Sequence, residues 1–208
     1  MAIKAVDKIL HKNNNKKISH IISVTNTPSI LFPSLSHQVY SKLNKKIGKE
    51  VTCIGINAGC SGYVDALSLA SKLIDANNKR GIIIVTSDNY SKNINSMDKS
   101  ILPLFSDAAT ATIISCRKKE SWRIVEQFSQ TIPNSLKDLI FFKINNNYEI
   151  KMNGPEVFLF SLKYVIPKLK KLIKNERNIT LFVHQASRLV LNEVKKQLKD
   201  NSRNLEMP

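Results

Sequence analysis

The chain has 208 residues, of which 42% are apolar, and its 32 Lys and Arg against 16 Asp and Glu give a net charge of +16. This apolar content excludes a disordered polycation, and the small numbers of Gly (6) and Pro (7) exclude a collagen-like or low-complexity chain. The longest aliphatic run, at residues 82–85, is far shorter than the roughly 20 residues that a membrane-spanning helix needs. The first residues show no secretory signal. We therefore expect one domain, or two packed halves, that do not cross a membrane.

The three cysteines, Cys53, Cys60 and Cys116, lie in apolar surroundings and form no C-x-x-C pair. An odd number without paired spacing argues against a disulfide framework and against a zinc site, so we predict no metal. Free thiols fit a reducing compartment, and we predict a cytoplasmic protein.

Much of the positive charge lies in short lysine-rich runs. These are typical of solvated helix faces, but they could also attract an anionic partner: a nucleic acid, an anionic membrane face, a phosphorylated cofactor or an acidic protein. The runs span residues 12–17, 42–49, 168–174 and 195–199.

The first half of the chain alternates strand patterns with amphipathic helix patterns. Short β-branched apolar runs that stop at Asn, Gly or Pro predict buried strands, and apolar residues that recur every three or four positions predict helices. The expected elements are a strand at 18–25, a helix capped by Ser34 with Leu35, Val39, Leu43 and Ile47 on one face, a strand at 51–56, a helix with the stripe Tyr63, Leu67, Ala70 and Ile74, and a strand at 81–86.

The second half continues this alternation less regularly, and the pattern weakens beyond Trp122. The expected elements are a strand at 109–115, a charged turn at 116–119, a loop tip at 145–147, a long helix at 156–174, a strand at 179–183 and a helix at 186–198. Strands that alternate with helices at these lengths predict an α/β fold with a largely parallel sheet.

Cys60 stands in the run Asn-Ala-Gly-Cys-Ser-Gly, between a predicted strand and a predicted helix. A thiol at a helix N-terminus meets unpaired N–H groups and the positive end of the helix dipole, so we expect its pKa to be depressed and its thiolate to be available near neutral pH. The alternative is that Cys60 is buried packing beside glycine.

His184 follows one predicted strand and precedes a helix, at the carboxyl end of the strand, where open α/β sheets place their ligands. Two such strand ends can converge although Cys60 and His184 are far apart in sequence. A Cys/His pair of this kind supports acyl transfer through a thioester. The alternative is a structural, partly buried histidine.

Other chemistry has less support. Gly55, Gly59 and Gly62 do not have the spacing of a dinucleotide fingerprint, and no phosphate-binding loop is present. The small residues two before and two after Cys60 do fit a nucleophile elbow. A Cys-type α/β-hydrolase with Asp107 and His184 therefore remains an alternative.

Five short motifs follow one another over nearly the whole chain. In chain order they are Thr25-Asn26-Thr27-Pro28 with Phe32-Pro33-Ser34, the run 56–63 around Cys60, Leu104-Phe105-Ser106-Asp107-Ala108-Ala109-Thr110-Ala111, Met152-Asn153-Gly154-Pro155-Glu156-Val157-Phe158, and His184-Gln185-Ala186-Ser187. In this order they resemble the motifs of the β-ketoacyl-acyl-carrier-protein synthase III family of the thiolase superfamily. Five motifs in register make the resemblance far more specific than any one motif.

The resemblance implies an α/β/α/β/α layered fold of two similar halves, which we place at residues 1–120 with the nucleophile and 121–208 with the histidine. It implies a homodimer and a condensation in fatty acid biosynthesis or a related pathway. Cys60 would take the acyl group from an acyl-CoA, and malonyl on acyl carrier protein would then lose carbon dioxide to form the attacking carbanion. His184 would donate a hydrogen bond to the malonyl thioester oxygen.

The resemblance also assigns further residues and partners. Phe32 matches the residue that lines the neighbouring subunit's acyl pocket, and Phe105 and Gly154 fall in motifs that we expect to bind substrate. Arg188 is a candidate for docking the acidic, phosphopantetheine-bearing carrier protein, which the charge of +16 would attract. No permanently bound cofactor, membrane or nucleic acid is expected.

Several departures from the family pattern shape these expectations. The family's catalytic Asn, in a Gly-Asn-Thr-Ser segment, and its Gly-rich oxyanion segment match no position here, and Ser106 and Ala108 replace two glycines. We therefore expect a synthase truncated at both ends, with inefficient decarboxylative condensation. A catalytically inactive fragment and a basic nucleic-acid-binding module remain alternatives.

Overall fold

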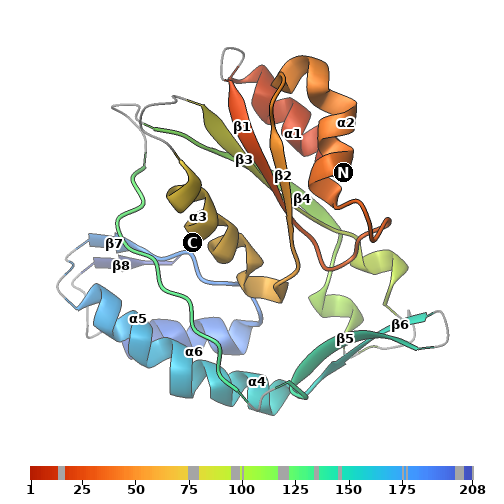
Figure 1. Cartoon of the computed structure of the whole chain (residues 1–208). Helices are drawn as coiled ribbons and strands as arrows, with labels where there is room; N and C mark the ends of the chain where they lie inside the picture. Colours follow the sequence, from red (N-terminus) through yellow and green to blue (C-terminus); the bar gives the residue numbers. More distant parts are fainter. Residues whose placement is uncertain are drawn as a thin grey trace. The chain divides into compact units, whose positions relative to one another are not determined.

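The computed structural model forms two compact units (Figure 1). Unit 1 comprises Met1–Asn93 and Ser106–Thr131, and unit 2 comprises Ile94–Phe105 and Ile132–Pro208. The structure describes residues 1–13, 17–74, 80–94, 99, 101–116, 122–133, 136–144, 147–174, 176, 178–199 and 204–207.

Unit 1 is built on a four-stranded sheet in the order β2-β1-β3-β4. β1 is parallel to both β2 and β3, and β4 pairs antiparallel with β3. The elements are α1 (Ala2–His11), β1 (Ile18–Val24), α2 (Leu35–Ile47), β2 (Thr52–Ile56), the 3₁₀ turn η1 (Gly59–Ser61), α3 (Gly62–Leu73), β3 (Gly81–Asp88), the 3₁₀ turn η2 (Tyr90–Lys92) and β4 (Ala108–Ile114). The largely parallel α/β architecture is as predicted.

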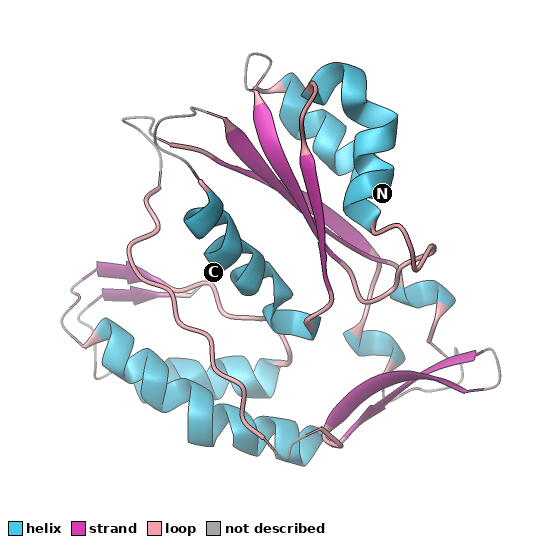
Figure 2. Ribbon diagram, in the orientation of Figure 1, coloured by secondary structure: helices cyan, strands magenta, loops and turns pink. Residues whose placement is uncertain are grey.

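Helices cover both faces of the central strands, with α1 and α2 on one face and α3 on the other (Figures 1 and 2). Successive side chains of a strand point to opposite faces. Ile21 and Ile83, which are paired in the sheet, therefore pack against α1 and α2, while Ile22 and Ile84 pack against α3. A strand covered on both faces needs apolar side chains throughout, which explains the aliphatic run at 82–85.

Unit 2 contains an antiparallel hairpin, a parallel strand pair and a helical layer. Its elements are the 3₁₀ turn η3 (Leu102–Leu104), β5 (Leu139–Ile144), β6 (Asn147–Met152), α4 (Gly154–Phe160), the π-helical turn η4 (Ser161–Val165), α5 (Ile166–Ile173), β7 (Asn178–Thr180), α6 (Arg188–Leu198) and β8 (Asn204–Glu206). Buried Ile166 and Ile173 of α5 pack with Val194 and Leu198 of α6.

The predicted helix at 156–174 forms as α4, η4 and α5 in succession. Pro167 lies in the first turn of α5 and has no N–H to donate to the preceding turn. A local widening of the helix is a common response to such a missing hydrogen bond. The helical stretch is therefore confirmed, but its regular α geometry is interrupted.

Other predicted boundaries need correction. The strand expected at 179–183 ends at Thr180, the helix expected from residue 186 begins at Arg188, and Tyr63 is exposed rather than part of a buried stripe. Tyr63 instead places its hydroxyl 3.1 Å from that of Thr112 on β4. Ser34 is the N-cap of α2 as predicted, but its hydroxyl bonds to the Ser36 and His37 side chains and not to a backbone N–H.

Two further predictions concern loops. The charged turn at 116–119 and the loop tip at 145–147 lie largely outside the described residues, and Asn147 begins β6. Sequence patterning missed the hairpin of β5 and β6, although residues 147–152 alternate polar and apolar side chains.

Candidate active site

Cys60 lies at the centre of η1, between the end of β2 and the start of α3, and is exposed. Two glycines shape this turn. Gly59 has a φ of +57°, which an L side chain rarely adopts. Gly62 is buried, and a Cβ there would lie only 2.5 Å from Val24 Cγ1, so α3 could not otherwise start this close to β1. The predicted strand-turn-helix setting of Cys60 is confirmed.

Side chains on both sides of Cys60 fix the turn. The backbone N–H of Gly59 donates to Asn26 Oδ1 at 3.1 Å. The Ser61 hydroxyl lies 3.0 Å from the Ala58 carbonyl oxygen and 2.9 Å from Asp65 Oδ2. The turn is thus tied to the loop after β1 and to the first turn of α3.

The expected depression of the Cys60 pKa is wrong, because surrounding groups raise it. Desolvation by the surrounding protein raises the pKa most, and the Asp88 carboxylate at the end of β3 adds to the increase. The backbone N–H of Cys60 lowers it, as a helix start should, but is the smallest of the three causes. The thiol, not the thiolate, is therefore the resting form near neutral pH.

Tyr90 in η2 belongs to the same surroundings. Burial, followed by the charges of Asp88 and Cys60, raises its pKa to about 12, against the lowering effect of its hydrogen bond with Asn26. Tyr90 is thus a neutral phenol over the whole physiological range. The sequence placed Asn26 in the first of the five motifs but gave it no role. It did not single out Asp88 or Tyr90, although both follow the end of a predicted central strand, where parallel sheets concentrate function.

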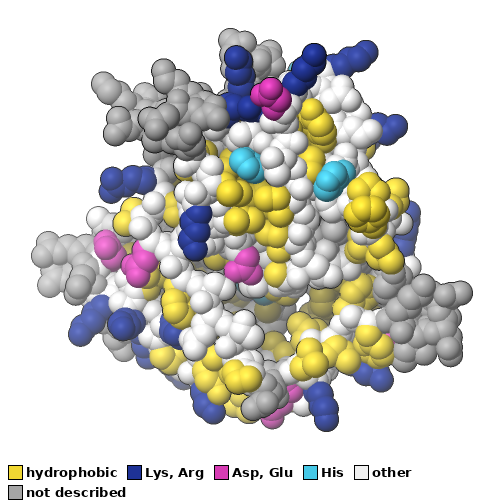
Figure 3. Space-filling model, viewed as in Figure 1, with side chains coloured by type: hydrophobic (Ala, Val, Ile, Leu, Met, Phe, Trp, Pro, Cys, Tyr) yellow, Lys and Arg dark blue, Asp and Glu magenta, His cyan; other side chains and the backbone are white. Residues whose placement is uncertain are grey.

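The remaining predicted site residues are divided between the two units. Phe32 belongs to unit 1, as Cys60 does, and its side chain is 89% exposed in the loop before α2. Hydrophobic side chains gather at this loop (Figure 3), where Ile30 and Leu31 are also exposed. The exposed loop thus offers an apolar surface on unit 1.

His184, Phe105, Gly154 and Arg188 belong to unit 2. His184 is exposed in the segment between β7 and α6, and its carbonyl oxygen accepts a hydrogen bond from Ala186 N–H. Arg188 is the exposed first residue of α6, and Gly154 is the exposed first residue of α4, after its N-cap Asn153. Phe105 is half-buried directly after η3.

Asp107, the acid of the hydrolase alternative, already accepts hydrogen bonds from another residue of unit 1. Its carboxylate accepts hydrogen bonds from the Ser91 backbone N–H at 2.8 Å and from the Ser91 hydroxyl at 2.6 Å. These bonds hold the pKa of Asp107 below its ordinary value. Asp107 therefore anchors η2, and its contacts explain its position without a triad.

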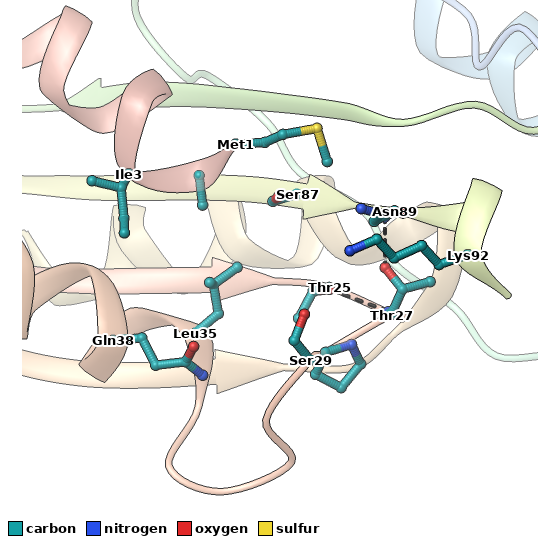
Figure 4. A pocket seen from close by; sticks show the side chains of 12 residues that line it. Met1, Ile3, Thr25, Thr27, Ser29, Leu35, Gln38, Ser87, Asn89 and Lys92 are labelled. Atoms are coloured by element: carbon teal, nitrogen blue, oxygen red, sulfur yellow. Dashed lines mark hydrogen bonds between the residues drawn. The ribbon is translucent and has the colours of Figure 1, made fainter. Parts of the chain in front are cut away.

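A pocket of about 290 Å³ opens beside the ends of β1 and β3 in unit 1 (Figure 4). Its polar lining includes Thr25, Thr27, Asn89 and Lys92, whereas Leu35 supplies an apolar wall. Within the described part of the chain, no cluster of three or more His, Cys, Asp or Glu could hold a metal ion. None of the helices that the structure describes has the length and apolar character needed to span a membrane.

Known proteins are similar to this chain in sequence and in fold. A family model for 3-oxoacyl-[acyl-carrier-protein (ACP)] synthase III matches residues 54–132, which include Cys60. The β-ketoacyl-[acyl-carrier-protein] synthase III of Clostridium novyi (strain NT) is 29% identical over 217 residues, covering 96% of this chain and 65% of the relative. This chain thus spans about two thirds of that relative's length.

Solved structures agree. A crystal structure of a 3-oxoacyl-(acyl-carrier-protein) synthase III matches all of this chain and 68% of its own, with a TM-score of 0.83 and 26% identity. The priming β-ketosynthase of the R1128 polyketide pathway, at 18% identity, has a TM-score of 0.81 over all of this chain and 65% of its own, and it supports the thiolase-like fold alone. In the segment around Cys60 and in its thiolase-like fold, the chain is thus similar to 3-oxoacyl-[acyl-carrier-protein] synthase III proteins.

Proposed function

We propose that this chain accepts an acyl group from an acyl-CoA on Cys60, as the first step of a 3-oxoacyl-[acyl-carrier-protein] synthase III reaction in fatty acid biosynthesis or a related pathway. The observation that carries the proposal is the exposed Cys60 on a tied 3₁₀ turn, inside the segment that matches the synthase III family model. We place this activity in the cytoplasm.

The acyl transfer exchanges one thioester for another. The Cys60 sulfur forms a bond to the acyl carbon, the bond from that carbon to the coenzyme A sulfur breaks, and the proton of the Cys60 thiol ends on the released coenzyme A thiol. Backbone N–H groups at the start of a helix can stabilise the oxyanion that forms during this exchange. Because the pKa of Cys60 is raised, loss of its proton is a substantial part of the barrier.

We assign the second step, condensation with malonyl carried on acyl carrier protein, to His184 as the hydrogen-bond donor to the malonyl thioester oxygen. Phe105 and Gly154 are proposed to contact substrate. An acidic carrier protein would be attracted to the net charge of +16, with Arg188 at the exposed start of α6 as a docking residue. No permanently bound cofactor is needed for either step.

We also propose that the protein works as a homodimer through the apolar loop that carries Phe32. Its 89% exposed aromatic ring, beside exposed Leu31, is the kind of side chain that protein interfaces bury. Light scattering tests this: we expect a dimeric mass for the wild type and a monomeric mass for Phe32→Asp. A monomeric wild type contradicts the proposal.

Incubation with radiolabelled acetyl-CoA tests the acyl transfer. We expect one stable label per chain, no label on Cys60→Ala, and full labelling of the matched variant Cys53→Ala, which removes a half-buried thiol of β2. Continuous release of free acetate without a stable label would identify a hydrolase instead. Equal labelling of wild type and Cys60→Ala would overturn the assignment of the nucleophile.

A further inference from the structure

A single carboxylate oxygen at the end of β3 organises the loop that follows β1. Asp88 Oδ1 accepts hydrogen bonds from the backbone N–H groups of Asn26 and Thr27 at 2.7 and 3.2 Å. It also accepts from the hydroxyls of Thr25 and Thr27 at 3.2 and 3.1 Å. Hydrogen bonds to an ionised acceptor are roughly twice as strong as neutral ones. The loop is therefore held by a charge that the proposed acyl transfer does not use.

The two threonine hydroxyls complete this arrangement, because each one also accepts a hydrogen bond. Thr27 N–H donates to Thr25 Oγ1 at 3.2 Å, and Asn89 N–H donates to Thr27 Oγ1 at 2.7 Å. Figure 4 shows both bonds at the ends of β1 and β3. Since each hydroxyl has one proton and gives it to Asp88, the direction of every bond in the network is fixed.

Asn26 connects this loop to the turn of the nucleophile. Its backbone N–H is bound by Asp88, its Oδ1 accepts the N–H of Gly59, and its Nδ2 donates to the Tyr90 hydroxyl at 3.4 Å. Gly59 directly precedes Cys60 and has the left-handed φ of +57° that the turn requires. A chain of hydrogen bonds thus connects Asp88 through Asn26 to Gly59, the residue that directly precedes Cys60 in its turn.

We propose that Asp88 is a positioning residue for Cys60, acting through Asn26 on the Gly59 turn. This inference rests on the proposed role of Cys60 as the acyl acceptor. The carboxylate has two opposed effects: it orients the turn, and its charge disfavours the thiolate. The protein thus retains a negative charge beside its nucleophile because the same group holds the nucleophile in place.

Two reactions of the same thiol separate these effects. Alkylation by iodoacetamide, a small reagent, reports how readily Cys60 ionises and how accessible it is. Acylation by acetyl-CoA also requires the thiol and nearby N–H groups to be correctly oriented. Because both reactions use the thiolate, a change in ionisation alone alters both rates alike and leaves their ratio unchanged. A change in the ratio of the acylation rate to the alkylation rate therefore reports a change in positioning.

Four variants test the proposal. For Asp88→Ala and Asn26→Ala we expect this ratio to fall by roughly tenfold to a hundredfold, because misplacement of a reacting group costs rates of this order. Asp88→Asn retains an acceptor oxygen for the loop, so it should keep a ratio close to that of the wild type while alkylation near neutral pH becomes faster. Asp7→Ala is the control: it removes a carboxylate on α1 that pairs with Lys46 and takes no part in the Asp88 network. It should change neither rate.

Hydrogen exchange of the Gly59 amide supplies a readout that does not depend on acyl transfer. We expect exchange to be faster in Asp88→Ala and Asn26→Ala and unchanged in Asp7→Ala. If the wild type is not acylated, the proposed function fails, and the exchange data alone decide the positioning claim. If Asp88→Ala does not fold, Asn26→Ala, which leaves the carboxylate in place, carries the test. Unchanged ratio and unchanged Gly59 exchange in these variants would overturn the proposal.

Discussion

The two units hold their proposed functional residues in different ways. In unit 1, Cys60 stands on a turn tied by Asn26 and Ser61, at the edge of a sheet whose central strands are buried on both faces. In unit 2, His184 lies in an exposed segment whose described contact is a backbone bond from Ala186 N–H. The geometry of the nucleophile is therefore set by contacts within unit 1. Substitutions in the core of unit 1 should alter the reactivity of Cys60 more than substitutions in unit 2 do.

Two fully buried side chains, one in each unit, sharpen this comparison most. Ile83→Ala in β3 and Leu198→Ala in α6 should each lower the free energy of unfolding by about 2–5 kcal/mol, because each leaves a cavity in a packed core. Only Ile83→Ala should lower the urea concentration at which Cys60 becomes rapidly alkylated. An equal shift in both variants would show that Cys60 does not depend on unit 1 alone.

The glycine at the start of α3 gives a smaller effect. Gly62→Ala places a Cβ 2.5 Å from Val24 Cγ1 and should cost about 1–3 kcal/mol of unfolding free energy through overpacking. Gly154→Ala is the matched change at the start of α4, where nothing lies within 4 Å of the added Cβ. It should be neutral or stabilising by about 0.4–1 kcal/mol. Chemical denaturation of both variants checks the contrast, and equal costs would contradict it.

The pH dependence of Cys60 alkylation tests the electrostatics of unit 1. Because desolvation by the surrounding protein and the charge of Asp88 raise the pKa of Cys60, the reactive thiolate forms only as the pH rises past the ordinary range of a thiol. Alkylation near pH 7 should therefore be slower than that of a free cysteine, and it should continue to accelerate at pH values where the free thiol has reached its plateau. A midpoint below that of a free cysteine would show that the helix start outweighs the other two causes.

The smallest effect is expected at the surface of unit 2. Arg188→Glu should weaken binding of an acidic acyl carrier protein several-fold at low salt and less at high salt, since exposed charges mainly steer association. Lys4→Glu makes the same change of charge on the exposed face of α1 and should alter binding less. Titration by calorimetry at two salt concentrations measures both, and equal weakening would remove Arg188 as a specific contact.

The sequence predicted the structure of unit 1 better than that of unit 2. In unit 1 the periodic apolar residues of α2 and the β-branched runs of β1 and β3 report burial directly, so these elements and the setting of Cys60 were predicted well. Local pattern could not reveal that Asp88 and Asn26 meet around Gly59, because those contacts join residues that are distant in sequence. The sequence also predicted that the helix start lowers the pKa of Cys60, but desolvation and the charge of Asp88 outweigh that effect.

In unit 2 the pattern was weaker for physical reasons. The strand β7 has only three residues, and Pro167 interrupts the hydrogen bonding of an otherwise continuous helical pattern. His184 was proposed from its place after a predicted strand, and its specific role, like those of Phe105, Gly154 and Arg188, came from the family resemblance. These roles stay predictions, as does the division into halves at residue 120.

Peptide mapping of the acylated protein tests the central claim most directly. After brief incubation of the wild type with acetyl-CoA near neutral pH, tandem mass spectrometry should locate the acetyl group on Cys60 alone, because it is the exposed cysteine and lies on the tied turn of unit 1. Acetylation of Cys53 or Cys116 before Cys60, or no acetylated cysteine at all, would contradict the account.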